Sequence, residues 1–344
     1  MKKRLFAILL AFALCVVFAA CGNSASSSTS STSNSTSQTS SQSNSSNDTA
    51  SSWPTGPVTI IVPAGAGGGT DLLARVAAEK LTQKLGQSFV VVNVTGAGGS
   101  NGTGQVYEAA PDGNTILFYH NAILTNYATG VTDYTYSDFD VGPHIVTDGA
   151  TGFYVRSDAP YQTYPELIEY ATAHPGEVVM ATEVGGFTYM MVKSFERATG
   201  VTFNIVDVGG NADKCTALLG GHIDIMPNQY STAAGYIESG DFVALGFPIE
   251  ERSAVYPDVP TAKEQGVDWL YNGYEFTFLF PKGTPQSIQD TFNNTIKELF
   301  DNNEIQEDIL KLGNDPTYMS PAEASQIFQG IQEEYQAIWA ETQG

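Results

Sequence analysis

Two glycine-rich stretches carry the residues that could do chemistry in this chain. Residues 63–71 follow the apolar run 58–62, and residues 96–104 follow the apolar run 89–92. Glycine lets a backbone turn sharply and bring its N–H groups close to a guest, and the first turn of a following helix leaves amide donors without internal partners. Two such loops predict a binding site for an anion, which we expect to be a carboxylate.

Each loop must be held between a strand and a helix. Residues 72–81 have the amphipathic pattern of a helix, and a second helical segment follows residues 96–104. Further along, strand-like apolar runs alternate with helical patterns, which predicts an α/β fold with largely parallel sheets. In such sheets, ligands bind where strand ends open into helix starts.

The remaining elements follow from the same patterns. Residues between 119 and 152 are interpreted as a polar connection, and further glycine openings occur at residues 185–186 and 209–210. The strand near residue 223 is expected to open at Pro227 and Asn228. The expected strands are residues 115–119, 152–155, 178–182, 203–206, 223–226, 242–247 and 276–280, and the expected helices are residues 165–174, 188–199, 212–219, 233–239, 290–312 and 321–340.

The first 52 residues predict export and anchoring. Residues 1–20 combine a basic start, an apolar core and small residues before Cys21, the pattern of a signal peptide. Residues 17–21 resemble a bacterial lipobox, which implies that Cys21 is lipidated; the alternative is plain secretion with cleavage near Cys21. Residues 22–52 are almost wholly Ser, Thr, Asn and Gln, which predicts a disordered tether with an end-to-end span of about 30 Å.

Charge and cysteine content limit the partners. The formal net charge is −22, and removal of three basic residues with the signal peptide makes it more negative, which disfavours nucleic acid and anionic lipid surfaces. Cys15 leaves with the signal peptide and Cys21 is expected to be acylated, so Cys215 remains alone and no intrachain disulfide is expected. Residues 53–344 suffice for one large domain or two lobes.

Ser100 raises a catalytic alternative. It stands at the centre of a Gly-x-Ser-x-Gly pattern, which is typical of a hydrolase nucleophile. However, several residues separate it from the preceding strand, and the last histidine, His222, comes well before the C-terminus.

The glycine loops also lack the endings of a P-loop or a dinucleotide fingerprint. His120, His144, His174 and His222 have no metal-ligand spacing, so we expect neither a metal nor a cofactor.

Six motifs in order resemble the substrate-binding proteins of tripartite tricarboxylate transporters, the TctC or Bug family. Together they cover nearly all of the chain from Val58 onward, and their joint spacing is more specific than any one glycine loop. They are residues 61–75, 96–99 (Gly-Ala-Gly-Gly), 110–115 (Ala-Pro-Asp-Gly-Asn-Thr), 217–224 (Ala-Leu-Leu-Gly-Gly-His-Ile-Asp), 256–261 (Tyr-Pro-Asp-Val-Pro-Thr) and 280–285 (Phe-Pro-Lys-Gly-Thr-Pro).

The resemblance implies a periplasmic-binding-protein fold, type 2-like, in which two α/β lobes close on a ligand in the cleft between them. It implies two crossings between lobes, which we place near Ala150 and Asn272, so that residues 53–149 and 274–344 form lobe 1 and residues 150–273 form lobe 2. It further implies that backbone amides and ordered water at the two glycine loops hold a ligand carboxylate. Dicarboxylates, tricarboxylates and some amino or aromatic acids are typical ligands.

The chain departs from the family pattern near the site. Relatives usually carry Phe at the position of Ala64, Pro at Ala66, and Arg-Pro where Val94 and Thr95 stand. They usually have Phe-Asp at Pro227–Asn228, and their Ser-His-Leu segment corresponds to residues 188–190. The loss of Phe opens space above the first loop, and Val94 removes a positive charge near the second, so the identity of the acid stays open.

The candidate ligand-binding residues come from both loops and from the glycine openings of lobe 2. Asp71 could order water at the ligand, favour its own helix N-terminus, or pair with Arg75 one turn on. Tyr119 and Tyr189 could line the cleft or belong to the core. The full set is Ala64, Gly65, Ala66, Gly69, Thr70, Asp71, Gly98, Gly99, Ser100, Asn101, Thr103, Tyr119, Gly186, Thr188, Tyr189, Gly209 and Asn228.

The interpretation that accounts for most of the chain is a monomeric receptor, lipid-anchored on the outer face of the bacterial cytoplasmic membrane. It would bind a small organic acid without chemistry and deliver it to the permease subunits of a tripartite tricarboxylate transporter. The alternatives are a secreted serine hydrolase that uses Ser100 and a surface adhesin with no small ligand.

Overall fold

The structure is a computed structural model that describes residues 53–183 and 186–343, and it contains two β-sheets. The signal peptide, the tether and the lipidation site Cys21 expected from the sequence lie outside the described residues. All described residues belong to one compact unit of the chain.

The first sheet has six strands in the order β11-β4-β10-β3-β1-β2. Its strands are β1 (Val58–Val62), β2 (Phe89–Asn93), β3 (Thr115–Tyr119), β4 (Phe139–Asp148), β10 (Tyr274–Pro281) and β11 (Asp315–Met319). Strand β1 lies between β2 and β3 and runs parallel to both. Four of its five residues are buried and apolar, and only Thr59 is polar and partly exposed, which is typical of a central strand covered on both faces.

Helices cover this sheet and bury one face each. Helix α1 buries Leu73, Ala77 and Leu81, which lie on one side of the helix. It ends at Gly86, whose φ of +70° is the left-handed conformation that glycine adopts at helix ends. The helices between and after the strands of the first sheet are α1 (Gly69–Leu85), α2 (Ser100–Tyr107), α3 (Ala122–Ala128), α8 (Gln286–Asp301), α9 (Gln306–Lys311) and α10 (Pro321–Thr342).

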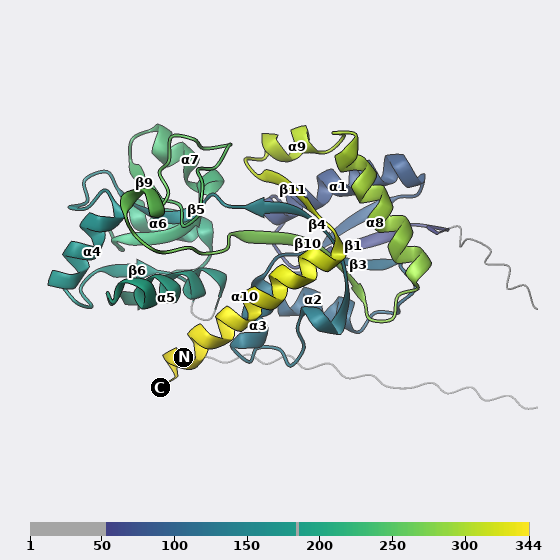
Figure 1. The fold of residues 1–344 in the computed structure, drawn as a ribbon, viewed down its shortest axis with the longest axis horizontal. Helices are drawn as coiled ribbons and strands as arrows, with labels where there is room; N and C mark the ends of the chain where they lie inside the picture. The colour runs from purple at the N-terminus through teal and green to yellow at the C-terminus, as the bar shows by residue number, and fades with distance from the viewer. Residues whose placement is uncertain (1–52, 184–185, 344) are drawn as a thin grey trace, which may run out of the picture. The chain divides into compact units, whose positions relative to one another are not determined.

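The second sheet has five strands in the order β7-β6-β8-β5-β9. Its strands are β5 (Thr151–Arg156), β6 (Val179–Ala181), β7 (Asn204–Val206), β8 (Ile225–Gln229) and β9 (Phe242–Gly246). Its helices are α4 (Tyr164–Ala173), α5 (Phe187–Thr199), α6 (Asn211–Leu219) and α7 (Tyr230–Glu238). The α/β fold class expected from the sequence is therefore confirmed (Figure 1).

The expectation of largely parallel sheets was wrong, because both sheets are mixed. Strand β10 is antiparallel to β3 and to β4, and β5 is antiparallel to β8 and to β9. Strand β4 ends where the chain enters the second sheet, and β10 begins where the chain returns to the first. Two neighbouring strands that carry the chain in opposite directions between sheets must be antiparallel.

Residues 119–152, interpreted from the sequence as a polar connection, contain α3 and the long strand β4. Gly142, Pro143 and His144 interrupt the apolar pattern of β4 and concealed it. The pairing of β4 with β10 shifts register between His144 and Val141, and such an irregularity accommodates a proline inside a strand.

The single helix expected at residues 290–312 is also wrong, since α8 ends at Asp301 and α9 begins at Gln306.

Pro227 and Asn228 lie inside strand β8 and do not form the opening expected there. On one side Pro227 is opposite Phe153 of β5, and on the other side β6 pairs with β8 only at Ile225. A proline at a position without a ladder partner on one side costs no hydrogen bond. The strand therefore continues to Gln229, and α7 begins directly after it.

The C-terminal helix α10 contacts elements of both sheets. A capping box between Ser320 and Glu323 begins the helix. It packs against α3, β4 and α5, and Trp339 lies edge-on to Tyr189 of α5 with ring centroids 6.2 Å apart. In Figure 1, α10 (yellow) runs from the first sheet toward α5. It therefore links the helices of the two sheets.

Candidate functional site

The first glycine loop connects β1 to α1, and the buried carboxylate of Asp71 holds it in place. Asp71 is 1% exposed. Its Oδ2 accepts hydrogen bonds from Gly67 N (2.8 Å) and Arg75 Nε (3.0 Å), and its Oδ1 accepts from Asn93 Nδ2 (3.0 Å). Burial opposes ionisation of Asp71, but the bonds from Arg75, Gly67 and Asn93 outweigh it and hold its pKa below the ordinary value. Both oxygens of this carboxylate are engaged inside the loop.

The backbone of the first loop is accessible to solvent from Gly65 to Gly69. Gly65, Ala66, Gly67, Gly68 and Gly69 are exposed, and no side chain caps the N-terminus of α1. A helix N-terminus without a side-chain cap presents N–H donors and a partial positive charge. This arrangement suits an anion.

The second glycine loop connects β2 to α2 through a 3₁₀ turn (Ala97–Gly99) and is held by buried side chains. Gly98 O accepts hydrogen bonds from Tyr119 Oη (3.2 Å) and Asn126 Nδ2 (3.0 Å). Gly99 has a φ of +90°, and a Cβ there would lie 2.3 Å from Tyr119 Oη. Only glycine fits this position. No side chain caps the N-terminus of α2.

The two loops lie side by side. Their strands β1 and β2 are adjacent and parallel, so both loops leave the same edge of the sheet. Val94 N donates to Val62 O (2.9 Å), and Asn93 Nδ2 donates to Ala64 O (3.0 Å). A Cβ on Gly102 of α2 would lie 3.0 Å from Pro63 Cα. The pair of loops is thus one continuous surface.

The second sheet contributes two further helix starts, those of α5 after β6 and of α6 after β7. Thr188, in the first turn of α5, is buried and shares a hydrogen bond with Thr182 Oγ1 (2.6 Å). Lys214, in the first turn of α6, is 1% exposed, and its Nζ donates to Thr188 Oγ1 (3.4 Å). Two helix N-termini and a buried ammonium therefore come together here.

Side chains of the two sheets meet at these loops. Gln229, at the end of β8, lies 3.9 Å from where a Cβ on Gly69 would stand. Tyr274 of β10 stacks on Phe187 of α5 with ring centroids 4.0 Å apart, and its ring also lies 4.6 Å from that of His120. The first glycine loop of the first sheet therefore faces the strand ends of the second.

Several residues named from the sequence are engaged within the protein. Thr103 is buried and its Oγ1 shares a hydrogen bond with Tyr134 Oη (2.9 Å). Asn101 Nδ2 donates to Thr95 O (3.1 Å), and Asn228 Nδ2 donates to Asn211 O (3.1 Å). Tyr119 holds the second loop and Tyr189 packs on Trp339, as described above. Ala64, Gly65, Ala66, Gly69, Thr70, Gly98, Gly186 and Gly209 lie in or beside the loops, where their role in binding stays a prediction.

Sequence reasoning missed Asn93 and Asn126, which hold the loops, Gln229, which lies beside Gly69, and the buried Lys214 of α6. Asn93, Asn126 and Gln229 have no local signal, since each acts on a residue far away in the sequence. Lys214 did carry a signal, because it stands four residues before the buried Leu218 in an amphipathic helix. A lysine on the buried side of a helix is unusual.

The arrangement gives the hydrolase alternative no support. Ser100 is the first residue of α2, and none of the histidines, all of which are described, hydrogen-bonds to it. His120 Nδ1 accepts from Ala122 N (3.2 Å), and His144 bonds to Thr277 and Thr147. Burial lowers the pKa of His120 and of His144 to about 3. Ser100 therefore has no histidine beside it that could act as a general base.

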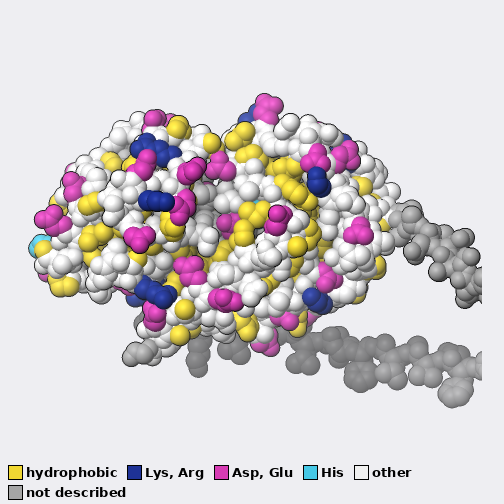
Figure 2. Space-filling view, viewed as in Figure 1, with side chains coloured by type: hydrophobic (Ala, Val, Ile, Leu, Met, Phe, Trp, Pro, Cys, Tyr) yellow, Lys and Arg dark blue, Asp and Glu magenta, His cyan; other side chains and the backbone are white. Residues whose placement is uncertain are grey.

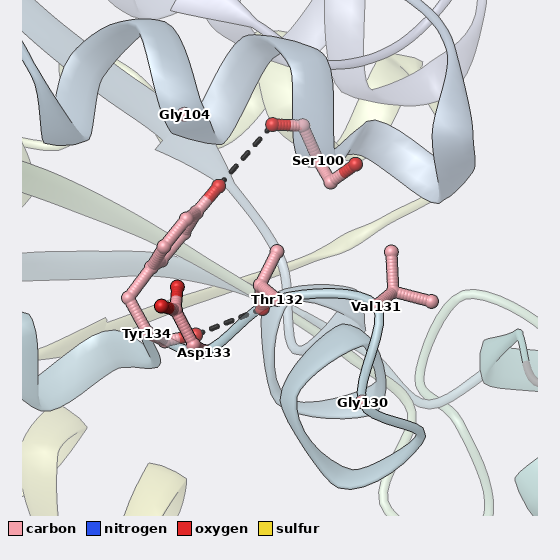
Figure 3. A pocket seen from close by; sticks show the side chains of 7 residues that line it. All are labelled: Ser100, Gly104, Gly130, Val131, Thr132, Asp133 and Tyr134. Atoms are coloured by element: carbon pink, nitrogen blue, oxygen red, sulfur yellow. Dashed lines mark hydrogen bonds between the residues drawn. The ribbon is translucent and has the colours of Figure 1, made fainter.

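A surface hollow of about 610 Å³ is lined by Ser100 and Gly104 of α2 and by residues 130–134 (Figure 3). Tyr134 Oη donates to Ser100 O (3.2 Å), and Thr132 Oγ1 donates to Tyr134 O (2.9 Å). Its lining contains the carboxylate of Asp133 and no basic residue. It is therefore a poorer site for an anion than the glycine loops.

The described residues offer neither a metal site nor a membrane-spanning helix. No group of three or more His, Cys, Asp or Glu residues is arranged to hold a metal ion in residues 53–183 and 186–343. No helix in the same part of the chain combines the length and apolar character that crossing a bilayer requires. Acidic side chains are spread over the face shown in Figure 2, and basic ones are fewer.

Comparison with known proteins places the chain beside solute receptors. A family model described as "Tripartite tricarboxylate transporter family receptor" matches residues 73–342. The UPF0065 protein in the gbd 5′ region of Cupriavidus necator is 30% identical over 281 residues, which cover 81% of this chain and 85% of that protein.

Two solved structures with ligands are also similar. A Rhodopseudomonas palustris protein with adipate has a TM-score of 0.72 and 27% identity, over 84% of this chain and 96% of that one. MatC from Rhodopseudomonas palustris with bound malate has a TM-score of 0.70 and 26% identity, over 83% of this chain and 100% of that one. These two-lobed relatives share the fold described above.

Proposed function

Because this chain belongs to the family of tripartite tricarboxylate transporter receptors, we propose that it is an extracellular solute receptor that binds a small organic acid and delivers it to permease subunits. The observation that carries this proposal is the pair of adjoining glycine loops, each of which leads into a helix N-terminus without a side-chain cap. Malate and adipate, the ligands of two similar structures, are both dicarboxylates.

In this proposal one ligand carboxylate binds at the N-termini of α1 and α2. Four backbone N–H groups of the loops already donate within the protein: Gly67 N to Asp71 Oδ2, Gly68 N to Gly65 O, Gly99 N to Gly96 O and Ser100 N to Ala97 O. The ligand would therefore bind the other N–H groups of the loops, those of Gly65, Ala66, Gly69, Thr70 and Gly98. The side chains of Asp71, Tyr119 and Asn126 do not need to touch the ligand, since they fix the loops before it arrives. Preformed donors bind an anion more tightly because less freedom is lost on binding.

Binding would proceed without chemistry. Gln229 of the second sheet lies beside Gly69 of the first loop, so a ligand bound at the loops could contact both sheets. A ligand that contacts both halves stabilises the arrangement in which they are close, and it thereby shifts the population toward that state. We propose that the permease recognises this closed state.

The tether and anchor belong to the same proposal. Lipidation at Cys21 would keep the receptor on the outer face of the cytoplasmic membrane, at a distance set by residues 22–52. Expression of the full chain and of Cys21→Ser in a bacterial host tests this. The full chain should fractionate with membranes and the variant should not.

A thermal-shift screen of the purified domain, residues 53–344, against a panel of carboxylates tests the function. At a ligand concentration of 100 times Kd we expect about 2.7 kcal/mol of stabilisation, which is a rise in Tm of roughly 4–5 °C for a domain of this size. The amide analogues of the same acids are the matched controls and should give no shift. Calorimetry then measures Kd for each hit. Absence of any shift across malate, adipate and longer acids would reject the proposal and favour a protein without a small ligand.

A further inference from the structure

A cavity of about 320 Å³ lies beside the two segments that carry the chain between the sheets. From these segments it is lined by residues 147 and 149 and by residues 270–273 and 275. Residues 248–250, which follow β9, and Glu334 of α10 complete the described lining. Three of these residues are glutamates, Glu250, Glu275 and Glu334, and none is basic. The cavity is therefore acidic, and no residue of the glycine loops belongs to its lining.

Glu275 is a carboxylate that the described residues leave without a cation. It is 4% exposed. Its Oε2 accepts a hydrogen bond from Thr147 Oγ1 (2.9 Å) and lies 3.4 Å from His144 Nε2. Burial lowers the pKa of His144 to about 3, so this histidine is neutral. The other oxygen, Oε1, has no hydrogen-bond partner among residues 53–183 and 186–343. Because Glu275 lines the cavity, a donor inside the cavity would satisfy this oxygen.

Glu334 brings a second carboxylate to the cavity from α10. It is partly buried, and it belongs to none of the ion pairs of the described residues. Burial raises its pKa, and the charge of Arg197 opposes the rise, but Arg197 itself pairs with Glu341. Glu250, by contrast, is exposed and paired with Lys263. The unpaired charge of the cavity therefore comes from its two more buried glutamates.

A structural role accounts poorly for Glu275. Glutamine would accept the same bond from Thr147 Oγ1 without the cost of removing a charge from water. Carboxylates bind guanidinium and ammonium groups through charge-assisted hydrogen bonds. The ring of Tyr271, also in the lining, suits an organic cation. His, Cys, Asp and Glu residues form no metal-binding group in the part of the chain that the structure describes. The lining therefore fits an organic cation better than a metal ion.

We propose that this cavity binds one organic cation, a guanidinium or primary ammonium group held between Glu275 and Glu334. Such a group comes either from a small free cation or from a basic side chain of a partner protein, and the chemistry of recognition is the same for both. The inference is independent of the proposed function, because neither glutamate lies at the glycine loops.

Calorimetric titration of the domain, residues 53–344, tests the site. The probe is butylguanidine, and butylurea is its matched control, because the two have the same shape and only the first is charged. At pH 8, above the pKa of about 7 to which burial raises Glu275, we expect a Kd on the order of 1 mM for butylguanidine, as is usual for so small a ligand. Butylurea should bind at least about tenfold more weakly.

Three variants assign the binding to the two glutamates. Glu275→Gln should weaken the binding of butylguanidine by at least about tenfold, the loss expected for a buried charge-assisted hydrogen bond. Glu334→Gln should weaken it by roughly two- to fivefold, because this carboxylate is partly exposed. Glu333→Gln changes the exposed neighbour on α10, which does not line the cavity, and should bind as the wild type does. The Tm of each variant verifies folding, and Glu334→Gln remains informative should Glu275→Gln not fold.

A peptide separates the two sources of the cation. Acetyl-Gly-Arg-Gly-amide presents the same guanidinium group on a polypeptide. Tighter binding of this peptide than of butylguanidine would identify a protein side chain as the occupant, and binding of butylguanidine alone would identify a small free cation. Equal binding of butylguanidine and butylurea overturns the inference, and so does a wild-type affinity for butylguanidine in both Glu275→Gln and Glu334→Gln. Absence of binding up to about 10 mM butylguanidine and peptide also overturns it. None of these outcomes bears on the carboxylate screen.

Discussion

At the scale of single residues, Asp71 is the side chain that holds the first glycine loop in shape. Its two oxygens accept bonds from Gly67, Arg75 and Asn93, and it is almost fully buried. Asp71→Asn replaces one acceptor oxygen with an amide donor that meets the N–H groups of Gly67 or Asn93. We expect a loss of about 1–3 kcal/mol in the free energy of unfolding, measured by chemical denaturation, and a loss of about tenfold or more in carboxylate affinity.

Arg75→Ala is the matched control for Asp71→Asn. Its side chain is 51% exposed, and exposed ion pairs contribute about 0–1 kcal/mol. The bonds from Gly67 and Asn93 to Asp71 stay in place in this variant. If Arg75→Ala cost as much stability as Asp71→Asn, the ion pair rather than the loop contact would explain the role of Asp71.

The sequence predicted part of this residue-scale arrangement. The pair of Asp71 and Arg75 is four residues apart on one helix, so local spacing was enough to suggest it. The bond from Asn93 depends on the pairing of β1 with β2, and the bond from Tyr119 to Gly98 spans 21 residues. Such contacts follow from the tertiary fold and leave no trace in local sequence. The spacing of Lys214 and Leu218 on α6 is also local, so it could have indicated from the sequence that Lys214 is buried.

At the scale of elements, the second loop depends on glycine at Gly99 more than the first loop depends on Gly65. Gly99 has positive φ and no room for a Cβ against Tyr119, whereas Gly65 has nothing within 4 Å of a Cβ. Gly99→Ala should cost at least about 1–3 kcal/mol of stability and abolish measurable carboxylate binding. Calorimetry and denaturant unfolding of the two alanine variants test this.

Gly65→Ala is the matched control, and we expect its stability to stay within about 0.5 kcal/mol of the wild type. Any loss of affinity in this variant would then report a methyl group that meets the ligand rather than a disturbed loop. Equal stability of the Gly99→Ala and Gly65→Ala proteins would show that the second loop is not constrained by Tyr119.

The elements that sequence patterns predicted best are those with a regular period and a glycine at their ends. The helices α1 and α5 are of this kind, since each is amphipathic and ends at a glycine, Gly86 or Gly200. The strand β1 is bounded by Pro57 and Pro63 instead, which mark its ends as clearly. Strand β4 was missed because Gly142 and Pro143 interrupt its pattern, and its place between β10 and β11 stabilises it all the same. Where the local pattern of a segment is ambiguous, pairing with strands far away in the sequence therefore determines whether the segment forms a strand.

At the scale of the whole molecule, the strands that join the two sheets carry buried acids. Asp148 ends β4, where its Oδ1 accepts from Ala150 N (3.0 Å) and its Oδ2 accepts from Gln229 Nε2. Glu275 lies beside it on β10, where Thr147 Oγ1 donates to its Oε2 (2.9 Å). Burial raises the pKa of Asp148 to about 6 and that of Glu275 to about 7, and in both cases the hydrogen bonds to the carboxylate oppose the rise.

These raised pKa values make folding stability depend on pH in a defined direction. Between the unfolded pKa of Glu275, near 4.5, and its folded pKa, about 7, the folded state holds a proton that the unfolded state has lost. The contribution of Glu275 to the free energy of unfolding therefore falls as pH rises through this window, and it levels off above about pH 7. Burial lowers the pKa of the neighbouring His144 from 6.5 to about 3, so between these values the unfolded state holds a proton that the folded state lacks. The contribution of His144 to stability therefore rises with pH and opposes that of Glu275, and it cancels when Glu275→Gln is compared with the wild type at each pH.

Glu275→Gln should remove this dependence, because glutamine keeps the shape and the acceptor oxygen but never ionises. We expect the variant to equal the wild type at pH 4.5 and to exceed it by on the order of 1–3 kcal/mol at pH 8, measured by chemical denaturation at each pH. Glu79→Gln, an exposed helix position, is the control and should shift both values by less than about 0.5 kcal/mol. Because β4 and β10 carry the chain between the two sheets, a charge at Glu275 would destabilise the junction itself. A Glu275→Gln curve parallel to that of the wild type from pH 4.5 to 8 would show that the proton is held elsewhere in the molecule.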